Sequence, residues 1–541
     1  MIPRRGAGWV AASANAELGQ VAHDGHRQGK ADERLAPGGT GRDARPTAKP
    51  GASKHDLPKP SPNSGAQRYE RLQRWLLVAM AALVAVHVGV LLYHLGVEVA
   101  FPYDLNYGEG YVLNDAVRLA HGESLYVDLQ QFPMVRSPYP PLYPLMWSAL
   151  VPLTGPVFWP GRAISALSLL GTGALVGWSA WRACRGIWPA VAAVGLVAAS
   201  PFVYQWAGYA RVDMLALLFA VGGVVAAQWL RGPRAILVAA LLCGLALWTK
   251  QTTVTAAIAV GLAFALRSWR SGVAFAAVLG LPSALALLVL NSTTGGEFAR
   301  HVLAGNATNP VMPLRSAIYV GTFVFLHLIA VTAGVWWLGR ALGGKPSPIA
   351  LYVPISLLAA LSAGNGGSSV NYLIEPILAL ALALPFAWRA LPAQSAVAGP
   401  MLAVAQFALL LHWPNTFGTN YLAESALGRT PTPADAAIGA HLDDLVRSEP
   451  GEVIAEPAGF AVRNGRPVYV QPIDLRAEQL QGRWRSEPLV SALTSGRFPR
   501  LITAFNLFPA DAERAIAQHF RLTETLPSPD GLTFQIFTYE S

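Results

Sequence analysis

Long apolar runs separated by short polar junctions dominate the chain between about residues 75 and 413. The first run, WLLVAMAALVAVHVGVLLYHLG, begins at Trp75 and has the length that an α-helix needs to cross a bilayer. The later runs, most of them of similar length, cover residues 161–181, 187–205, 212–230, 235–249, 252–267, 271–290, 315–339, 347–363, 370–388 and 397–413. This pattern predicts an all-α polytopic membrane protein with about eleven transmembrane helices.

Basic residues fall at every second junction between these runs. They are Arg182 and Arg185, Arg231 and Arg234, Arg267 and Arg270, Arg340 and Lys345, and Arg389. The positive-inside rule makes these junctions cytoplasmic, and the arginines that precede the first run make the N-terminus cytoplasmic too. The expected outer segments are then residues 98–160, 206–211, 250–251, 291–314, 364–369 and everything after 413.

One apolar segment, YPPLYPLMWSALVPLTGP (139–156), does not fit this alternation as a crossing. It is short and interrupted by prolines, and a crossing there would invert every later loop. We therefore expect a re-entrant or juxtamembrane helix on the outer face, which is tolerated where protein or a cavity covers the backbone.

The composition agrees with a membrane protein. Only 13% of the 541 residues are charged and 53% are hydrophobic, whereas a soluble domain carries about 25% charged residues. The net charge of +9 is explained by membrane topology, so no nucleic-acid partner is expected. The two cysteines form no disulfide or zinc framework. Residues 1–68 lack apolar periodicity, which predicts a disordered cytoplasmic tail before the transmembrane domain of residues 75–413.

Residues 414–541 have a different pattern, in which short alternating segments predict strands and amphipathic segments predict helices. The expected strands are 452–456, 466–471, 499–506 and 532–539, and the expected helices are PADAAIGAHLDDLVRS and PADAERAIAQHFRL. This predicts a small extracytoplasmic α/β domain. It contains no phosphate loop, metal cluster or nucleophile elbow, which favours a lid or acceptor-docking domain over a second catalytic domain.

Carboxylates gather in the first outer loop, 98–160, just after the first span. Asp104 and Glu109 precede an amphipathic helix expected at residues 111–122. A carboxylate at the water–lipid boundary can have a raised pKa and accept a proton from a hydroxyl group. The alternative is an ordinary solvated loop carboxylate. Asp115 and Glu123 lie further along this segment, and a structural role is expected for both.

Two other outer junctions carry charges at the ends of spans. Arg211 could bind a phosphate, and Asp213 could bind a substrate hydroxyl or a cation; the alternative is an interfacial arginine with a helix-capping aspartate. Lys250 lies on the expected outer side against the usual charge bias. It could pair with a lipid-linked phosphate, or its side chain could extend to the headgroups.

The segment GNGGSSVNYLIEP (364–376) leads into a further span. Its glycines allow a close approach of backbone to a ligand. Asn371 and Glu375 are four residues apart and share one helix face, with Tyr372 beside them. A glutamate one turn into an apolar helix is costly unless it is paired, so it marks either a functional site or a buried structural hydrogen bond.

These segments together resemble the GT-C superfamily of integral membrane glycosyltransferases. The resemblance rests on YGEGYVLNDAVRLAHGESLY, SPYPPLYPL, YARVDMLALLF, WTKQT and NYLIEP, and it covers roughly residues 75–390. The bacterial branch related to protein mannosyltransferases and the lipid A aminoarabinose transferase is the most similar. One departure concerns the first motif, which is often an adjacent Asp-Glu pair in the family and is Gly108-Glu109 here.

The resemblance implies a transferase of the bacterial cytoplasmic membrane that uses a polyprenyl-phosphate sugar as donor. Glu109, alone or with Asp104, would be the general base toward an extracytoplasmic glycan, lipid or protein acceptor, and the reaction would invert the anomeric carbon. Lys250 and Arg211 would neutralise the leaving phosphate.

Asp213 would orient a substrate or hold a divalent cation if the enzyme uses one; no other cofactor is expected. Asn371, Tyr372 and Glu375 would line the donor pocket. Two other functions stay open at this point, a transporter or flippase of a lipid-linked sugar and a non-catalytic envelope assembly protein. The charges cluster on one face of the membrane and no internal repeat is evident, which favours the transferase.

Overall fold

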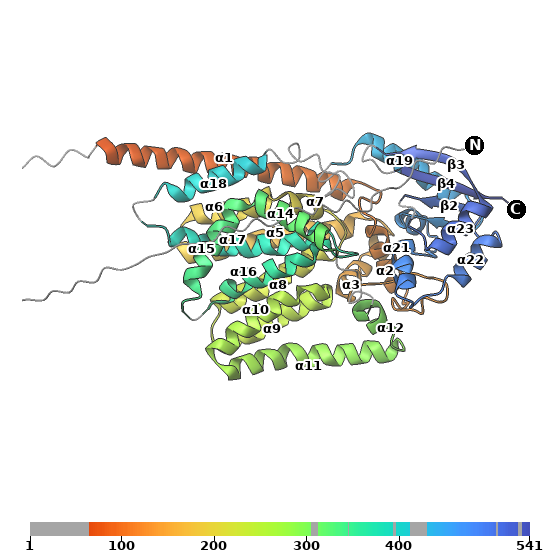
Figure 1. The fold of residues 1–541 in the computed structure, drawn as a ribbon, viewed down its shortest axis with the longest axis horizontal. Helices are drawn as coiled ribbons and strands as arrows, with labels where there is room; N and C mark the ends of the chain where they lie inside the picture. The colour runs from red at the N-terminus through yellow and green to blue at the C-terminus, as the bar shows by residue number, and fades with distance from the viewer. Residues whose placement is uncertain are drawn as a thin grey trace, which may run out of the picture. The chain divides into compact units, whose positions relative to one another are not determined.

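The computed structural model describes residues 64–304, 312–344, 346–392, 396–411, 430–504, 507–528 and 533–540. The expected cytoplasmic tail, residues 1–68, lies almost entirely outside the described residues. The described chain is mainly helical, with one small sheet near the C-terminus (Figure 1).

The apolar runs form long or medium helices. They are α1 (Ser64–Ala100), α5 (Trp159–Cys184), α6 (Ile187–Ala199), α8 (Asp213–Trp229), α9 (Gly232–Thr249), α10 (Val254–Arg267), α11 (Trp269–Thr293), α14 (Pro313–Leu326), α15 (Leu328–Ala341), α16 (Pro348–Ala359), α17 (Ile374–Arg389) and α18 (Ala398–Leu411). Short connecting elements are α7 (Pro201–Trp206), η1 (Gln251–Thr253), α12 (Glu297–Ala299), η2 (Arg300–Ala304), η3 (Ala360–Gly364) and η4 (Val370–Leu373).

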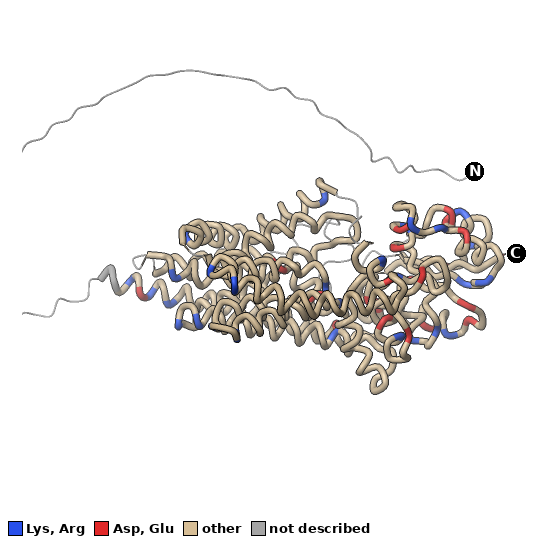
Figure 2. The backbone as a smooth tube through the Cα atoms, turned by 90° about the horizontal axis from the view of Figure 1, so that it is seen from below, with Lys and Arg blue, Asp and Glu red and all other residues tan. Residues whose placement is uncertain are grey.

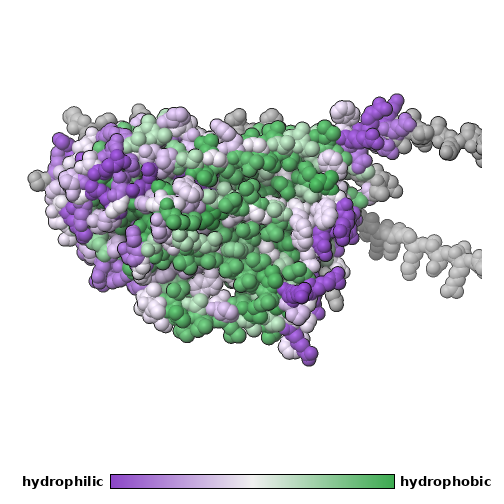
Figure 3. Space-filling view, turned by 180° about the vertical axis from the view of Figure 1, so that it is seen from behind, coloured by the Kyte–Doolittle hydropathy of each residue, from purple (hydrophilic) through white to green (hydrophobic). Residues whose placement is uncertain are grey.

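Among the described residues, five helices are long and apolar enough to cross a membrane, namely α1, α5, α9, α11 and η4 with α17. The pair α14 and α15 is a sixth candidate, and the shorter apolar helices α6, α8, α10, α16 and α18 pack among them. On the face shown in Figure 3, a broad apolar surface lies between hydrophilic ends of the molecule. The chain is therefore a polytopic membrane protein, and eleven crossings remain a prediction.

Charged residues are unevenly distributed along the helix bundle. Most of its charged residues lie near the two ends, and the end away from the C-terminal sheet carries mainly Lys and Arg (Figure 2). That the basic junctions at this end are cytoplasmic stays a prediction of the positive-inside rule.

The expected single span at 315–339 is instead two helices, α14 and α15, with an angle of 88° between them at His327. The break leaves backbone N–H and C=O groups without helical hydrogen-bond partners, and the Gln406 side chain of α18 pairs with two of them. Its Nε2 donates to the Leu326 carbonyl at 2.7 Å, and its Oε1 accepts from the Ala330 N–H at 3.2 Å. In apolar surroundings such a side chain makes a broken helix tolerable.

The interrupted segment 139–156 forms two short helices, α3 (Leu142–Ser148) and α4 (Val151–Thr154), which pack near α2 (Glu109–Ala120). The fully buried Tyr143 donates to the Gly161 carbonyl at 2.8 Å, and the Trp147 ring occupies the space beside Gly161. These contacts hold the segment against the start of α5, and its helices are far shorter than a span.

The C-terminal domain contains a four-stranded sheet of order β1-β2-β4-β3. The strands are β1 (Val453–Ala455), β2 (Arg500–Thr503), β3 (Phe520–Pro527) and β4 (Thr533–Tyr539), and the helices are α19 (Pro433–Ser448), α20 (Gly459–Arg463), α21 (Pro472–Leu480), α22 (Glu487–Thr494) and α23 (Ala510–His519). Strands β1 and β2 are parallel, whereas β4 is antiparallel to both β2 and β3.

Three of the four expected strands and both expected helices are present in this domain. The expected strand 466–471 is wrong, because only Val470 forms a bridge there, to Met134 of the first loop. Strand β3 was missed, and its first residues were assigned to the preceding helix. Its apolar positions Phe520, Leu522 and Leu526 do alternate with polar ones, but Glu524 breaks the series, and most side chains of this edge strand are exposed or half-exposed.

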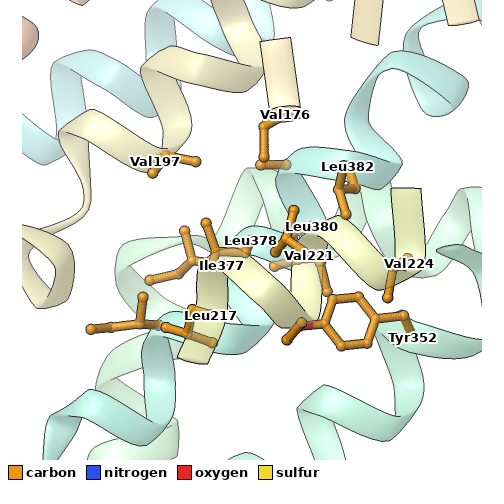
Figure 4. Packing of buried hydrophobic residues seen from close by; sticks show 14 of the residues in the cluster. Val176, Val197, Leu217, Val221, Val224, Tyr352, Ile377, Leu378, Leu380 and Leu382 are labelled. Atoms are coloured by element: carbon orange, nitrogen blue, oxygen red, sulfur yellow. The ribbon is translucent and has the colours of Figure 1, made fainter. Parts of the chain in front are cut away.

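The core of the bundle is a cluster of small and branched apolar side chains. Figure 4 shows Val176 of α5, Val197 of α6, Val221 of α8 and Leu378 of α17 within this cluster. Helix α17 is apolar on nearly every side and almost wholly buried, as expected for a central helix. The polar first turn of α17 is thereby fixed at one end of the bundle.

Candidate active site

Glu109 begins α2 and is completely buried. Arg162, at the start of α5, donates to both of its carboxylate oxygens, from Nε to Oε1 at 3.0 Å and from Nη2 to Oε2 at 2.8 Å. The backbone N–H groups of Leu105 and Ala210 donate to the same carboxylate at 2.7 Å and 2.6 Å. Four donors therefore hold Glu109, and a substrate cannot reach it without disrupting a buried ion pair.

Arg162 is the residue that organises the first outer loop. Its guanidinium also donates to the backbone carbonyls of Glu98, Phe101 and Tyr103, and it lies 4.8 Å from the centre of the Phe158 ring. The rigid fork of an arginine suits such a set of acceptors. The sequence analysis missed Arg162; its only signal was an arginine near the start of an apolar run.

Asp104 differs from Glu109 in that it has no such partners. The residue is partly exposed as a whole, yet both carboxylate oxygens are buried and accept no hydrogen bond from another described residue. Burial, and then the charge of Glu109, raises the pKa of Asp104 to about 8, although Arg162 and Arg463 act in the opposite direction. Such a carboxyl exchanges its proton near neutral pH, as a general base must.

Two glycines make room for the Asp104 carboxylate. A Cβ at Gly459, at the start of α20, would lie 2.1 Å from Asp104 Oδ2, and a Cβ at Gly110 would lie 2.6 Å from Oδ1. Arg463 of α20 lies 4.6 Å from the centre of the Tyr103 ring and donates to the Pro102 carbonyl. The C-terminal domain therefore covers the first outer loop at this carboxylate.

Arg211 is held mainly by aromatic side chains. Its Nη2 donates to the Tyr139 hydroxyl at 2.9 Å, and its guanidinium lies 5.7 Å and 5.9 Å from the ring centres of Tyr139 and Trp206. Its Nε is buried without a hydrogen-bond partner among the described residues. A side chain at Gly108 would overlap the Arg211 guanidinium, so an aspartate at that position of the motif would require the Arg211 side chain to move.

Asp213, Lys250 and Asn371 form one buried cluster. Asp213 Oδ1 accepts from Lys250 Nζ at 2.6 Å and from Asn371 Nδ2 at 2.7 Å, and its Oδ2 accepts from Trp206 Nε1 at 2.9 Å. Lys250 also lies 4.4 Å from the centre of the Tyr372 ring. Three segments that are far apart in the sequence are thus joined at one point.

Glu375 lies one turn into α17, next to this cluster. Its Oε1 accepts hydrogen bonds from the hydroxyls of Thr255 and Tyr352, the latter at 2.9 Å. Asn371 lies in η4 and Glu375 in α17, and both line one cavity.

The remaining acids of the first outer loop have structural partners. Asp115 accepts from the Ser137 hydroxyl at 2.8 Å, and the exposed Glu123 pairs with Arg118 at 3.3 Å. Within the described part of the chain, no group of three His, Cys, Asp or Glu side chains has the arrangement of a metal site.

Two solved structures of ArnT from Cupriavidus metallidurans are similar to this chain. The structure bound to undecaprenyl phosphate has a TM-score of 0.55 and 13% sequence identity, and the apo structure has a TM-score of 0.53 and 16% identity. Each alignment covers 84% of this chain and 97% of the ArnT chain. No family model and no curated protein sequence matches the chain. At this level of identity, the similarity shows that the described chain has the fold of these ArnT structures.

Proposed function

We propose that this chain is an integral membrane glycosyltransferase that transfers a sugar from a polyprenyl-phosphate donor to an acceptor at the outer face of the cytoplasmic membrane. The observation that carries this proposal is that Trp206 contacts both Arg211 and the Asp213–Lys250 pair, so two cations lie close together on the fold of an ArnT crystallised with undecaprenyl phosphate.

The donor phosphate binds between Arg211 and Lys250. Arg211 has a buried Nε without a partner, so an arriving phosphate oxygen gains a charge-assisted hydrogen bond at little cost in reorganisation. Asp213 fixes the Lys250 ammonium at 2.6 Å and keeps it ionised in apolar surroundings. Both cations stabilise the charge that develops on the leaving phosphate.

Asp104 is the general base, and Glu109 is a positioning residue. This assignment revises the expectation for Glu109, because four donors occupy its carboxylate while Asp104 has none from another residue. Asp104 takes the proton of the acceptor hydroxyl as the hydroxyl oxygen attacks the anomeric carbon. The bond from that carbon to the phosphate oxygen breaks, polyprenyl phosphate leaves, and the configuration inverts.

The C-terminal domain is a cover over the acceptor side. Helix α20 contacts the first outer loop through Gly459 and Arg463, close to Asp104. An extracytoplasmic glycan, lipid or protein acceptor reaches the base only by entering between α20 and this loop. The domain thereby excludes water from the reacting groups and restricts which acceptors enter.

The proposal is tested with full-length protein in nanodiscs and a panel of radiolabelled polyprenyl-phosphate sugars, with cell-envelope extract as the source of acceptor. We expect turnover by the wild type and a loss of about 10²-fold or more in Asp104→Asn, with its thermal unfolding retained. Binding of the donors without turnover under all these conditions would favour the transporter. Unchanged turnover in Asp104→Asn would refute the base assignment.

A further inference from the structure

An apolar cavity of about 440 Å³ lies beside the bend between α14 and α15. Its wall on α15 runs from Leu328, the first residue after the bend, to Trp336, a distance of about 12 Å at the rise of an α-helix. The last turns of α17, the helix α18 and Leu196 of α6 form the other walls. The cavity is therefore elongated along α15 and has the shape of a chain rather than of a compact molecule.

Arg340 lies at the Trp336 end of this cavity. Its guanidinium is 4.4 Å from the centre of the Trp336 ring, and both side chains are exposed. The neighbouring Trp337 stacks on Phe386, with 5.4 Å between the ring centres, so the last turns of α15 and α17 lie together. An exposed cation is thus fixed over an aromatic ring that lines the cavity.

A second arginine, Arg389, ends α17 next to Trp388, which also lines the cavity. Arg389 donates to the Ala183 carbonyl at 3.1 Å, and neither Arg340 nor Arg389 forms an ion pair with a described residue. The chain offers few acids for this purpose. Between residues 159 and 411 the acidic residues are only Asp213, Glu297 and Glu375, and each has another partner. The positive charge at this end of the bundle, visible in Figure 2, therefore needs an anion from outside the described chain.

The cavity and its two arginines together restrict the ligand. Nearly all of the lining is apolar, and Gln406 uses both ends of its amide on backbone groups at the bend. The cavity therefore suits a hydrocarbon chain. A guanidinium binds phosphate through charge-assisted hydrogen bonds, and tryptophan rings lie at the headgroup level of membranes. We infer that this is a binding site for an anionic phospholipid, with one acyl chain in the cavity and the phosphate on Arg340.

This phospholipid site is separate from the proposed donor site, and the inference does not depend on the transferase activity. The donor phosphate is placed at Lys250, beside Asn371, whereas Trp388 lies 17 positions further along the chain, about 25 Å at helical rise. A polyprenyl chain that arrived from Lys250 would bring no charge to Arg340. The phospholipid enters from the leaflet at the basic end, fills the cavity and holds α15 against α17 and α18.

Two substitutions test the two halves of the site. Arg340→Gln removes the charge from an exposed side chain, so it is expected to leave the fold intact. Ala333→Phe fills the cavity from its α15 wall. Arg270→Gln is the matched control, because Arg270 is also exposed and lies 5.7 Å from the centre of the Trp269 ring, but neither residue lines the cavity.

The experiment uses delipidated full-length protein in an uncharged detergent. Native mass spectrometry gives Kd for dioleoyl phosphatidylglycerol and for dioleoyl phosphatidylcholine, and thermal unfolding gives Tm with each lipid. We expect the wild type to bind one phosphatidylglycerol about fivefold to tenfold more tightly than phosphatidylcholine, with a higher Tm. Arg340→Gln should bring the two affinities within about twofold of each other, and Ala333→Phe should weaken both by about 10-fold or more. Arg270→Gln should behave like the wild type.

Equal wild-type affinity for the two lipids would overturn the site, as would equal effects of Arg340→Gln and Arg270→Gln. Displacement of phosphatidylglycerol by glycerol 3-phosphate would show that the arginines bind a free phosphate. Displacement by undecaprenyl phosphate would assign the cavity to the chain of the donor, and either displacement would refute the inference. If Ala333→Phe fails to fold, the comparison of Arg340→Gln with Arg270→Gln still decides the question.

Discussion

Replacing Glu109 by glutamine distinguishes an anchor of the first outer loop from a catalytic base. The substitution keeps the shape of the side chain and removes its charge. One carboxylate oxygen becomes an amide group that faces Arg162 and a backbone N–H, so donors then oppose donors.

The expected magnitude follows from the burial of the pair. Glu109 and Arg162 are both fully buried, and their N–O distance is 2.8 Å. Removing one partner of a buried ion pair costs about 3–5 kcal/mol, because the other charge is left without compensation. We expect Glu109→Gln to lower the free energy of unfolding by this amount and the Tm by several degrees.

The assay is thermal unfolding of purified protein in one detergent, together with turnover on the same samples. Glu123→Gln is the matched control. It makes the same chemical change in the same loop, but Glu123 is 56% exposed and its ion pair with Arg118 is worth at most about 1 kcal/mol. The control should unfold like the wild type.

The reasoning would be refuted by a particular combination of results. If Glu109→Gln unfolds at the wild-type temperature while its turnover falls by about 10²-fold, Glu109 acts in the chemistry and does not anchor the loop. A loss of stability with turnover retained at low temperature would support the anchor.

We expect kcat/KM to rise with pH up to about 8, because burial raises the pKa of Asp104 to about 8 and only the ionised carboxylate accepts a proton. A flat profile of kcat/KM between pH 6 and 9 would contradict this. The pKa of Asp104 in the folded protein exceeds the usual value of 3.8, so Asp104 destabilises the fold increasingly from about pH 4 to pH 8. Asp104→Asn should therefore have a higher Tm than the wild type at pH 8 but not at pH 4. Gly459→Ala should lower both turnover and Tm, because its Cβ would lie 2.1 Å from Asp104 Oδ2. If turnover and Tm of the variant equalled those of the wild type, α20 would be able to shift without loss of stability. Lys250→Met should lower the free energy of unfolding by about 3–5 kcal/mol, because it removes the counter-ion of Asp213. Adding Asp213→Asn should recover part of that loss, whereas additive losses in the double variant would argue against coupling of the two residues.

The transmembrane part of the fold could be predicted because each long span is a local property. A stretch of about 20 apolar residues must be helical in lipid, whatever its neighbours are. The bend at His327 could not be predicted in this way. It depends on Gln406, about 80 positions away, whose amide supplies the partners for the interrupted backbone.

Charge patterning likewise identified the residues that would gather at the outer face. Asp213, Lys250 and Asn371 were singled out because polar groups at span ends are costly, and the structure joins all three. No sequence pattern could show which carboxylate of the first outer loop lacks hydrogen-bond donors. Arg162 comes from another element, and it separates Glu109 from Asp104 together with the backbone N–H groups of Leu105 and Ala210.

The sequence by itself determined the class of the protein, the positions of most helices and the residues worth testing, since hydrophobicity and charge act over a few neighbouring positions. Only the tertiary structure decided which polar groups have hydrogen-bond partners. Whether a carboxylate is satisfied depends on donors brought together from distant parts of the chain. The same physical reason explains why Asn371 Oδ1 is buried without a partner among the described residues, because it is left over once Nδ2 donates to Asp213.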